Sequence, residues 1–187
     1  AIDLRRAIIA EDDEVFVAID YSGEELRIAA NVANERAWIH EFNHGNGDLH
    51  TLTAQSMFKK TEISKVERGH GKSANFLTIY GGGANRLHGA TGLPREDCDA
   101  MLEGFFEGAP DLKDWLRHEV NRTRKRGFSR TAFGRRRSVL SYLESTDNYE
   151  KSKADRIATN ACIQGTGGDI LKIAMWRVWS SIRDKGW

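Results

Sequence analysis

Four side chains that could bind a nucleotide recur at a spacing of four residues in one segment of the chain. Arg68, Lys72, Phe76 and Tyr80 stand in this order, two cations followed by two aromatic rings. A helix would place them along one face, because residues four apart lie one above the other. The cations could then neutralise phosphate charge, and the rings could stack on a sugar and a base. An amphipathic helix with solvated charges and a buried aromatic end is the alternative interpretation.

A second segment offers a metal ligand at the end of an apolar run. Residues 14–20 read Glu-Val-Phe-Val-Ala-Ile-Asp, which predicts a buried strand that ends at Asp20. A carboxylate held at the tip of a strand is a suitable ligand for a hard divalent cation. Alternatively, Asp20 or Ser22 caps the helix that follows, since Ser22 and Glu25 have the spacing of a capping box.

Together these two segments resemble motifs A and B of the family A DNA polymerases. Motif A of that family follows the pattern DYSxxELR, which occurs here from Asp20 to Arg27, and motif B follows RxxxKxxxFxxxYG, which occurs from Arg68 to Gly81. The resemblance implies a DNA-directed DNA polymerase that transfers dNMP from a dNTP to a primer 3′-hydroxyl, with primer-template DNA and dNTP as partners. It covers almost the whole chain, because further pieces follow the family's order at residues 4–8, 48–51, 131–137 and 160–172.

The resemblance also implies roles for individual residues. Asp20 and the backbone carbonyl of Tyr21 would bind Mg²⁺, of which the family uses two ions, and Asp20 and Lys72 would be catalytic. Glu25 paired with Tyr80 would exclude a ribose 2′-hydroxyl. The expected nucleotide-binding residues are Tyr21, Glu25, His50, Arg68, Lys72, Phe76 and Tyr80. The expected DNA-binding residues are Arg6, Arg135, Arg136, Arg156, Asn160 and Gln164.

Two departures from the family pattern bear on activity. Motif C of the family, a His-Asp-Glu set in a hydrophobic hairpin, has no counterpart in the sequence. The chain is therefore interpreted as the palm-and-fingers part of a polymerase, either truncated or completed by a C-terminal polypeptide that supplies the second catalytic Asp. The alternative is a fragment, or a subunit of a split polymerase, that binds nucleotide and primer-template without catalysis. In addition, Gly23 and Glu24 replace the family's usual Gln and hydrophobic residue, and Glu24 adds a carboxylate beside the nucleotide site.

Gly71-Lys72-Ser73 looks like the end of a phosphate-binding P-loop, but the rest of that motif is missing. A P-loop requires a glycine five residues before Gly71, where Val66 stands, and an apolar strand before the loop. The sequence therefore argues against a P-loop NTPase.

Positive charge is concentrated in residues 117–137, which contain nine Lys or Arg residues and one acid, Glu119. The whole chain has a formal net charge of only +1, so the remainder is net acidic. This basic tract predicts a phosphate-binding surface, with a solvated helix face as the alternative.

Cys98 and Cys162 lack metal-ligand spacing, and no long apolar run occurs. We therefore expect no membrane association and a reducing compartment, the cytoplasm of a bacterial or phage-infected cell, with an organelle as the alternative.

The expected fold is α+β and mostly helical: a partial polymerase palm with a short antiparallel sheet, and a complete helical fingers subdomain. The palm is expected at 1–45 and again at 146–187, and the fingers with the basic tract at 46–145. A helix over 65–80 should end at the glycines that follow it. The other expected elements are a strand at 14–20, helices at 23–33 and 48–59, helices that start near Pro94 and Pro110, a hairpin within 127–134, and one or two helices over 148–183 with an apolar stripe of Ile170, Ile173, Ala174 and Val178.

Overall fold

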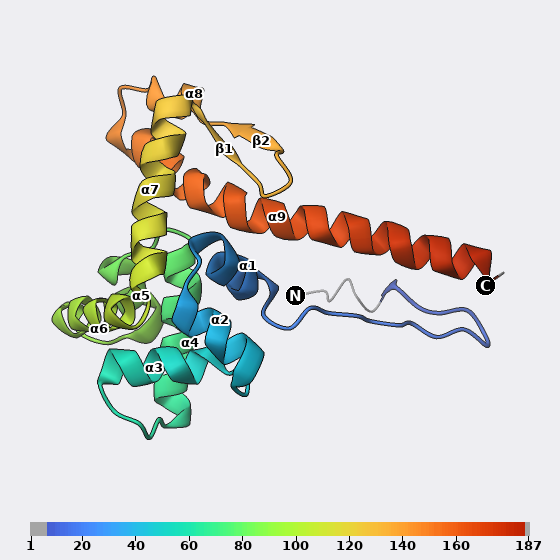
Figure 1. Ribbon diagram of the computed structural model, residues 1–187, viewed down its shortest axis with the longest axis horizontal. Coiled ribbons are helices and arrows are strands. Elements are labelled where there is room, and N and C mark those ends of the chain that lie inside the picture. Colours follow the sequence, from blue (N-terminus) through green and yellow to red (C-terminus); the bar gives the residue numbers. More distant parts are fainter. Residues whose placement is uncertain (1–6, 186–187) are drawn as a thin grey trace.

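The structure is a computed structural model that describes residues 7–185 of the 187-residue chain. Helices dominate, and within the described residues the only sheet is a two-stranded hairpin. Figure 1 shows a body of short helices, with α7 rising from it and the long helix α9 projecting away to one side. The expected α+β, mostly helical fold is confirmed. No helix in the described range combines the length and the hydropathy that a bilayer crossing requires.

Short connections join most of the helices. Those expected at 23–33, 48–59 and 65–80, and near Pro94 and Pro110, are confirmed as α1, α3, α4, α6 and α7, with ends within a few residues of the prediction. Three short helices, α2, α5 and α8, were not predicted. In chain order the elements are α1 (Glu24–Ala33), α2 (Arg36–His44), α3 (Leu49–Phe58), α4 (Lys65–Ile79), α5 (Ala84–Thr91), α6 (Arg95–Gly108), α7 (Pro110–Arg126), β1 (Phe128–Arg130), β2 (Arg136–Ser138), α8 (Leu140–Leu143) and α9 (Asn148–Asp184).

The strand expected at 14–20 is wrong. These residues have no regular secondary structure, and Val15, Val17 and Ile19 are 82%, 79% and 81% exposed. A strand forms only where a neighbouring strand pairs with its backbone N–H and C=O groups, and no described segment pairs with this one. Asp20 is consequently exposed and lies at the end of an irregular segment, not at the tip of a buried strand.

The hairpin extends further along the chain than predicted. Strands β1 and β2 are antiparallel, with Phe128 opposite Ser138 and Arg130 opposite Arg136. The predicted range, 127–134, therefore contains β1 and part of the connecting turn, while β2 lies beyond it.

Most of the buried apolar side chains form one core among the short helices. Trp38 of α2 and Phe105 of α6 are almost completely buried, and their rings meet edge to face with centroids 6.1 Å apart. A second, smaller cluster packs Val139 against Ile157 and Ala161 of α9. The larger cluster holds α1 and α4 in place, and the smaller one fixes the region of the hairpin and α8 on α9.

A buried carboxylate, Glu35, joins the starts of two helices. Its side chain accepts hydrogen bonds from the backbone N–H of Ala37 in α2, at 3.2 Å, and of Leu112 in α7, at 3.0 Å. Both N–H groups belong to first turns, which have no partners within their own helices. Glu35 therefore fixes α7 relative to α2 and explains why a helix starts at Arg36, where the sequence offers no common cap such as Ser or Asp.

Helices α3 and α4 lie close together at Gly71. A Cβ atom on Gly71 would lie 2.4 Å from the carbonyl oxygen of His50 and 3.1 Å from the Cβ of Ala54. Only glycine leaves room for this approach, which explains a residue that otherwise disfavours a helix interior. The start of α4 is fixed by a capping box, in which Ser64 and Glu67 exchange hydrogen bonds of 3.3 Å and 2.9 Å.

Helix α9 is a single helix of 37 residues, about 55 Å long at the usual rise. Its first half packs against α1, α7 and β1. The second half projects from the body (Figure 1), and Trp176 and Trp179 on it are 66% and 55% exposed. The expected apolar stripe of Ile170, Ile173, Ala174 and Val178 is only partly covered, and with Tyr21, Phe133 and Arg177 it lines a groove of about 490 Å³.

We predict opposite effects of alanine at the two glycines in the first half of α4. Gly71→Ala should lower the free energy of unfolding by about 1–3 kcal/mol, because its methyl group overlaps the backbone of α3. Gly69→Ala is the matched control, since open space surrounds that position, and it should raise the free energy by about 1 kcal/mol through helix propensity. Urea unfolding followed by circular dichroism measures both. Equal effects would contradict the close approach.

Candidate functional site

The four residues spaced along α4 differ in exposure between the two ends of the helix. Arg68 and Lys72 are exposed, whereas Phe76 and Tyr80 are half-buried. The face extends about 18 Å along the helix axis from Arg68 to Tyr80. It carries charge at one end and rings at the other, as the spacing predicts. Gly71-Lys72-Ser73 lies inside this helix, which is inconsistent with a P-loop.

At the charged end, Arg68 forms a two-point ion pair with Asp48. Its Nε donates to Asp48 Oδ2 and its Nη2 donates to Asp48 Oδ1, both at 2.9 Å. Asp48 also caps α3, where it accepts hydrogen bonds from the backbone N–H of Thr51 at 3.4 Å and from its hydroxyl at 2.7 Å. The hydrogen bonds from Arg68 contribute most to lowering the pKa of the Asp48 carboxyl to about 2.

His50 lies beside these cations and is held by a buried amide. Asn75 accepts a hydrogen bond from Thr53 through Oδ1, at 2.9 Å, and its Nδ2 lies 3.0 Å from His50 Nδ1. An amide nitrogen only donates, so Nδ1 accepts and the neutral ring carries its proton on Nε2. Burial, followed by the charges of Arg68 and Lys72, lowers the pKa of His50. His50 thus presents an N–H donor next to two cations.

At the ring end, Tyr80 links three helices. Its hydroxyl donates to Glu25 Oε2 of α1 and accepts a hydrogen bond of 3.3 Å from Gln164 Nε2 of α9. Burial, and then the hydrogen bond to the Glu25 carboxylate, raise the pKa of the Tyr80 phenol to about 12. The hydroxyl therefore remains protonated and able to donate at neutral pH.

Glu25 does not act as a helix cap. The residue that precedes α1 is Gly23, in the left-handed region at φ 63°, and no side chain caps this helix. The capping box considered for Ser22 and Glu25 is therefore absent. Glu25 is available for its bond with Tyr80.

Acidic side chains gather at the start of α1. Burial is the main cause that raises the pKa of Glu24, and the charges of Glu25 and Asp20 add to it. Glu24 Oε1 is buried without a hydrogen-bond partner among the described residues, and the Glu24 carboxylate lies against Gly167 of α9. Negative potential is thus concentrated where the sequence predicts a cation.

The residues at this point fit a cation that is shared with a substrate. Within residues 7–185, no three His, Cys, Asp or Glu side chains are grouped closely enough to hold a metal ion by themselves. Mg²⁺, however, is commonly bound by one or two carboxylates together with substrate phosphates and water. The exposed carboxylate of Asp20 and the backbone carbonyl of Tyr21 are oxygen donors of this kind.

Three of the predicted DNA-binding residues meet between the hairpin and α9. Asn160, Gln164 and Arg135 line a cavity of about 220 Å³. Asn160 Oδ1 is buried and has no partner among the described residues. Arg135 is engaged internally, because it donates to Asp169 Oδ1 and to the carbonyl of Gly165, both at 2.8 Å. It therefore ties the hairpin to α9.

The other predicted DNA-binding residues lie apart from this cavity. Arg136 is on the exposed hairpin, with its guanidinium 4.7 Å from the centre of the Phe128 ring. Arg156 donates to Ser152 at 3.1 Å and lies next to Gly81 at the end of α4. Arg6 lies outside the described residues.

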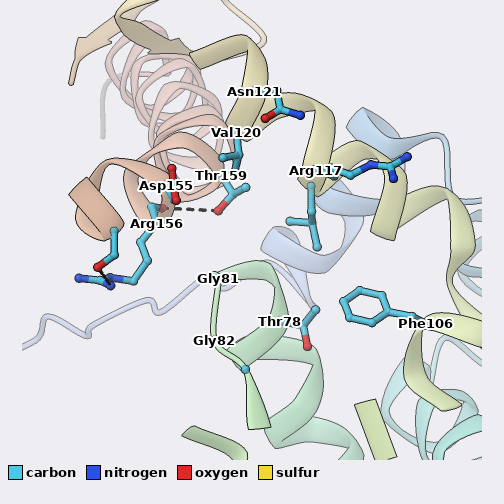
Figure 2. Close-up of a pocket in the computed structure, with 13 residues that line it drawn as sticks. Thr78, Gly81, Gly82, Phe106, Arg117, Val120, Asn121, Asp155, Arg156 and Thr159 are labelled. Atoms are coloured by element: carbon cyan, nitrogen blue, oxygen red, sulfur yellow. Dashed lines mark hydrogen bonds between the residues drawn. The ribbon is translucent and has the colours of Figure 1, made fainter. Parts of the chain in front are cut away.

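Arg156 also lines a cavity that the sequence did not predict. Figure 2 shows it between the turn after α4, helix α7 and the first part of α9, with a volume of about 500 Å³. Arg117 and Asn121 line it from α7, and the buried hydroxyl of Thr78 has no hydrogen-bond partner among the described residues. Gly81, Gly82 and Gly83 line this cavity, but from the sequence they predicted only the end of a helix.

Part of the basic tract is used inside the protein. Arg122 and Arg126 pair with the buried carboxylate of Glu119, and Arg124 pairs with Asp155 at 2.6 Å. The cations that remain exposed and have no carboxylate within 4.0 Å in the described part of the chain include Arg130, Arg136 and Arg137 of the hairpin. The predicted phosphate-binding surface is therefore smaller than the sequence indicates.

The overall arrangement is similar to that of a DNA polymerase domain. The POL domain of Pol1 from M. smegmatis, solved in complex with DNA primer-template and dNTP, superposes with a TM-score of 0.82 at 34% sequence identity. The similarity covers 89% of this chain and 30% of that one.

Sequence comparison gives the family. Residues 1–187 match DNA polymerase family A, and the chain belongs to this family. It is 35% identical over 185 residues to the thermostable DNA polymerase I of Thermus aquaticus, covering 98% of this chain and 22% of that protein. It is also 35% identical over 184 residues to DNA polymerase I of Borreliella burgdorferi, covering 97% and 20%. The chain thus spans about a fifth of the length of these bacterial relatives.

The ion pair between Asp48 and Arg68 predicts a specific dependence of stability on acid. Because the pKa of Asp48 is lowered in the folded state, the pair should stabilise the fold fully above about pH 4 and lose its effect as the pH falls toward 2. In the Asp48→Ser variant, the serine hydroxyl can still cap α3, but it is too short and uncharged to form the ion pair with Arg68. The difference in unfolding free energy between wild type and Asp48→Ser, measured with urea, should therefore shrink between about pH 4 and 2. A difference that stays constant would contradict the assignment.

Proposed function

We propose that this chain is the nucleotide-binding and template-binding part of a DNA-directed DNA polymerase, which transfers dNMP from a dNTP to a primer 3′-hydroxyl as a template directs. The proposal depends on the arrangement of side chains along one face of α4. The cations of this face lie beside His50, and the ring at its other end, Tyr80, is hydrogen-bonded to Glu25. Membership of DNA polymerase family A supports it. The structural neighbour was solved with primer-template and dNTP, which is consistent with the same partners here.

The charged end of α4 is proposed to bind the triphosphate. Arg68 and Lys72 supply positive charge, and the neutral His50 supplies an N–H donor. Lys72 is also proposed to donate a proton to the leaving pyrophosphate. Phe76, half-buried and with its ring centroid 5.9 Å from that of His50, offers a surface on which sugar and base can pack.

Glu25 and Tyr80 are proposed to select the sugar. Their hydrogen bond fixes a carboxylate and a ring at the end of the proposed nucleotide face, where an extra 2′-hydroxyl would need room. A site without that room discriminates by exclusion. Tyr80 is also proposed to stack near the template base before the site closes.

Asp20 and the carbonyl of Tyr21 are proposed to hold Mg²⁺, with two ions in the complete enzyme. When bound, such ions activate the primer hydroxyl and stabilise charge on the leaving pyrophosphate. The residues of this chain orient the reactants: Asp20 presents an exposed carboxylate, and Arg68 and Lys72 hold the phosphates.

Primer-template is proposed to contact α9 and the hairpin. Asn160 and Gln164 lie in the cavity between them, Arg156 lies at the cavity beside α7, and Arg135 and Arg136 are on the hairpin. Arg6 is proposed to join them. Amide side chains can check the minor-groove acceptors that every correct base pair presents, which tests pair shape without reading sequence.

The proposed division of the chain is palm at 1–45, fingers at 46–145 and palm again at 146–187. Residues 14–20 pair with no described strand, and the second half of α9 exposes Trp176 and Trp179. These surfaces suit a further palm segment that contributes strands and the second catalytic Asp. The alternative is that the chain binds nucleotide and DNA without catalysis, either as a fragment or as a subunit of a split polymerase.

Lys72→Ala should separate nucleotide binding from DNA binding. Loss of a charge-assisted contact should weaken binding of dATP with Mg²⁺ by about 10- to 100-fold, while affinity for a primer-template duplex changes less than about twofold. Calorimetric titration measures the first and fluorescence anisotropy the second. Equal losses in both assays would indicate a general basic surface.

The catalytic assignments can be tested in a chimera that carries this chain in place of the matching segment of the Thermus aquaticus enzyme. Asp20→Asn should abolish primer extension and leave DNA binding intact. Primer extension by the Asp20→Asn chimera would remove Asp20 from the mechanism.

Glu25→Ala in the same chimera should raise ribonucleotide incorporation relative to deoxynucleotide incorporation by about 10- to 100-fold. Glu24→Ala is the matched control, because Glu24 makes no hydrogen bond with Tyr80, and it should keep the sugar preference.

A further inference from the structure

The ion pair between Asp48 and Arg68 uses only part of the guanidinium. Arg68 donates from Nε and Nη2 to the two oxygens of Asp48, both at 2.9 Å. A guanidinium has five N–H groups in a fixed plane, so Nη1 and the second hydrogen of Nη2 stay free to donate elsewhere. Asp48 therefore holds Arg68 along one edge and leaves the other edge open.

Asp48 itself is held firmly by the start of α3. It accepts from the backbone N–H and the hydroxyl of Thr51, which restrains its carboxylate on the first turn of the helix. The pair is half-exposed on the Arg68 side, with 45% of that side chain accessible, so an anion can reach the open edge. Arg68 and Lys72 are four residues apart in α4, so both lie on the same face of that helix, and their charges contribute to lowering the pKa of His50.

We propose that Asp48 is a positioning residue for triphosphate recognition, which fixes the plane of the Arg68 guanidinium so that its open edge faces the phosphates. This inference rests on the proposed function, because it takes Arg68 to be a triphosphate ligand. A long arginine side chain loses rotamer freedom when it binds an anion, and a prior clamp removes part of that loss. Without Asp48, Arg68 keeps its charge but contributes less to binding.

A competing role for Asp48 has the opposite consequence. If the carboxylate acted as an internal substitute for phosphate, the triphosphate would have to displace it, and its removal would make Arg68 a stronger ligand. The negative charge of Asp48 also repels the triphosphate in either case. Single variants at Asp48 mix these effects, so the test has to isolate the coupling between the two residues.

A double-mutant cycle on the 187-residue chain isolates this coupling. The variants are Arg68→Ala, Asp48→Ser and the combination of both, each titrated with dATP and Mg²⁺, and with inorganic triphosphate, by calorimetry. The repulsion by Asp48 cancels, because each effect of Arg68→Ala is measured within one Asp48 background. Arg68→Ala should weaken binding at least about tenfold when Asp48 is present, and less than about threefold in the Asp48→Ser background.

Two features protect the test against a trivial loss of structure. Serine is a good helix cap, so Asp48→Ser should keep α3 folded, which circular dichroism can verify. Asp48→Asn is the conservative variant: its carbonyl oxygen can still accept one hydrogen bond from Arg68, so the effect of Arg68→Ala should be partly restored. A residue with only a structural role would show no such rescue.

The outcomes separate the inference from the proposed function. An effect of Arg68→Ala that is equal or larger without Asp48 overturns the positioning role, and a larger one establishes competition instead. If wild type binds neither ligand, or if Arg68→Ala has no effect when Asp48 is present, the triphosphate site on α4 is wrong and the inference falls with it. A reduced effect, with rescue by Asp48→Asn, supports the positioning role.

Discussion

The hydrogen-bonded chain from Glu25 through Tyr80 to Gln164 is the contact on which the geometry of the candidate site depends. It connects α1, α4 and α9, which carry the acidic cluster, the proposed nucleotide face and the amides of the proposed DNA surface. Because the phenol pKa is about 12, the hydroxyl donates to Glu25 and accepts from Gln164 throughout the physiological range. The hydroxyl of Tyr80 thus fixes the C-terminal end of α4 relative to α1 and α9.

The local elements of this fold could largely be predicted from the sequence, whereas the long-range pairing could not. Helix α4 was predictable because its start, its periodicity and its end are encoded within one segment: a capping box at Ser64, and Gly81 in a left-handed conformation after the last turn. The strand expected at 14–20 failed because a strand is defined by its neighbour and not by its own apolar pattern. Helix α2 was missed because its cap, Glu35, also serves α7 and has no sequence signal of its own.

The candidate site shows the same division. Arg68, Lys72, Phe76 and Tyr80 could be recognised because a helix repeats every four residues, so their shared face follows from local geometry. The partners of the cations could not, since Asp48 pairs with Arg68 across 20 residues and Asp169 pairs with Arg135 across 34. Charge density alone does not reveal which arginines are used internally. The basic tract therefore predicted a wider phosphate-binding surface than the structure leaves.

Helix α9 is unbroken from Asn148 to Asp184, although three glycines stand near its middle. Gln164, whose amide donates to Tyr80, and the exposed Trp176 and Trp179 therefore belong to one continuous helix. No loop separates the exposed tryptophans from the hydrogen bond between Gln164 and Tyr80, so no hinge of irregular backbone lies between them to absorb a displacement of either.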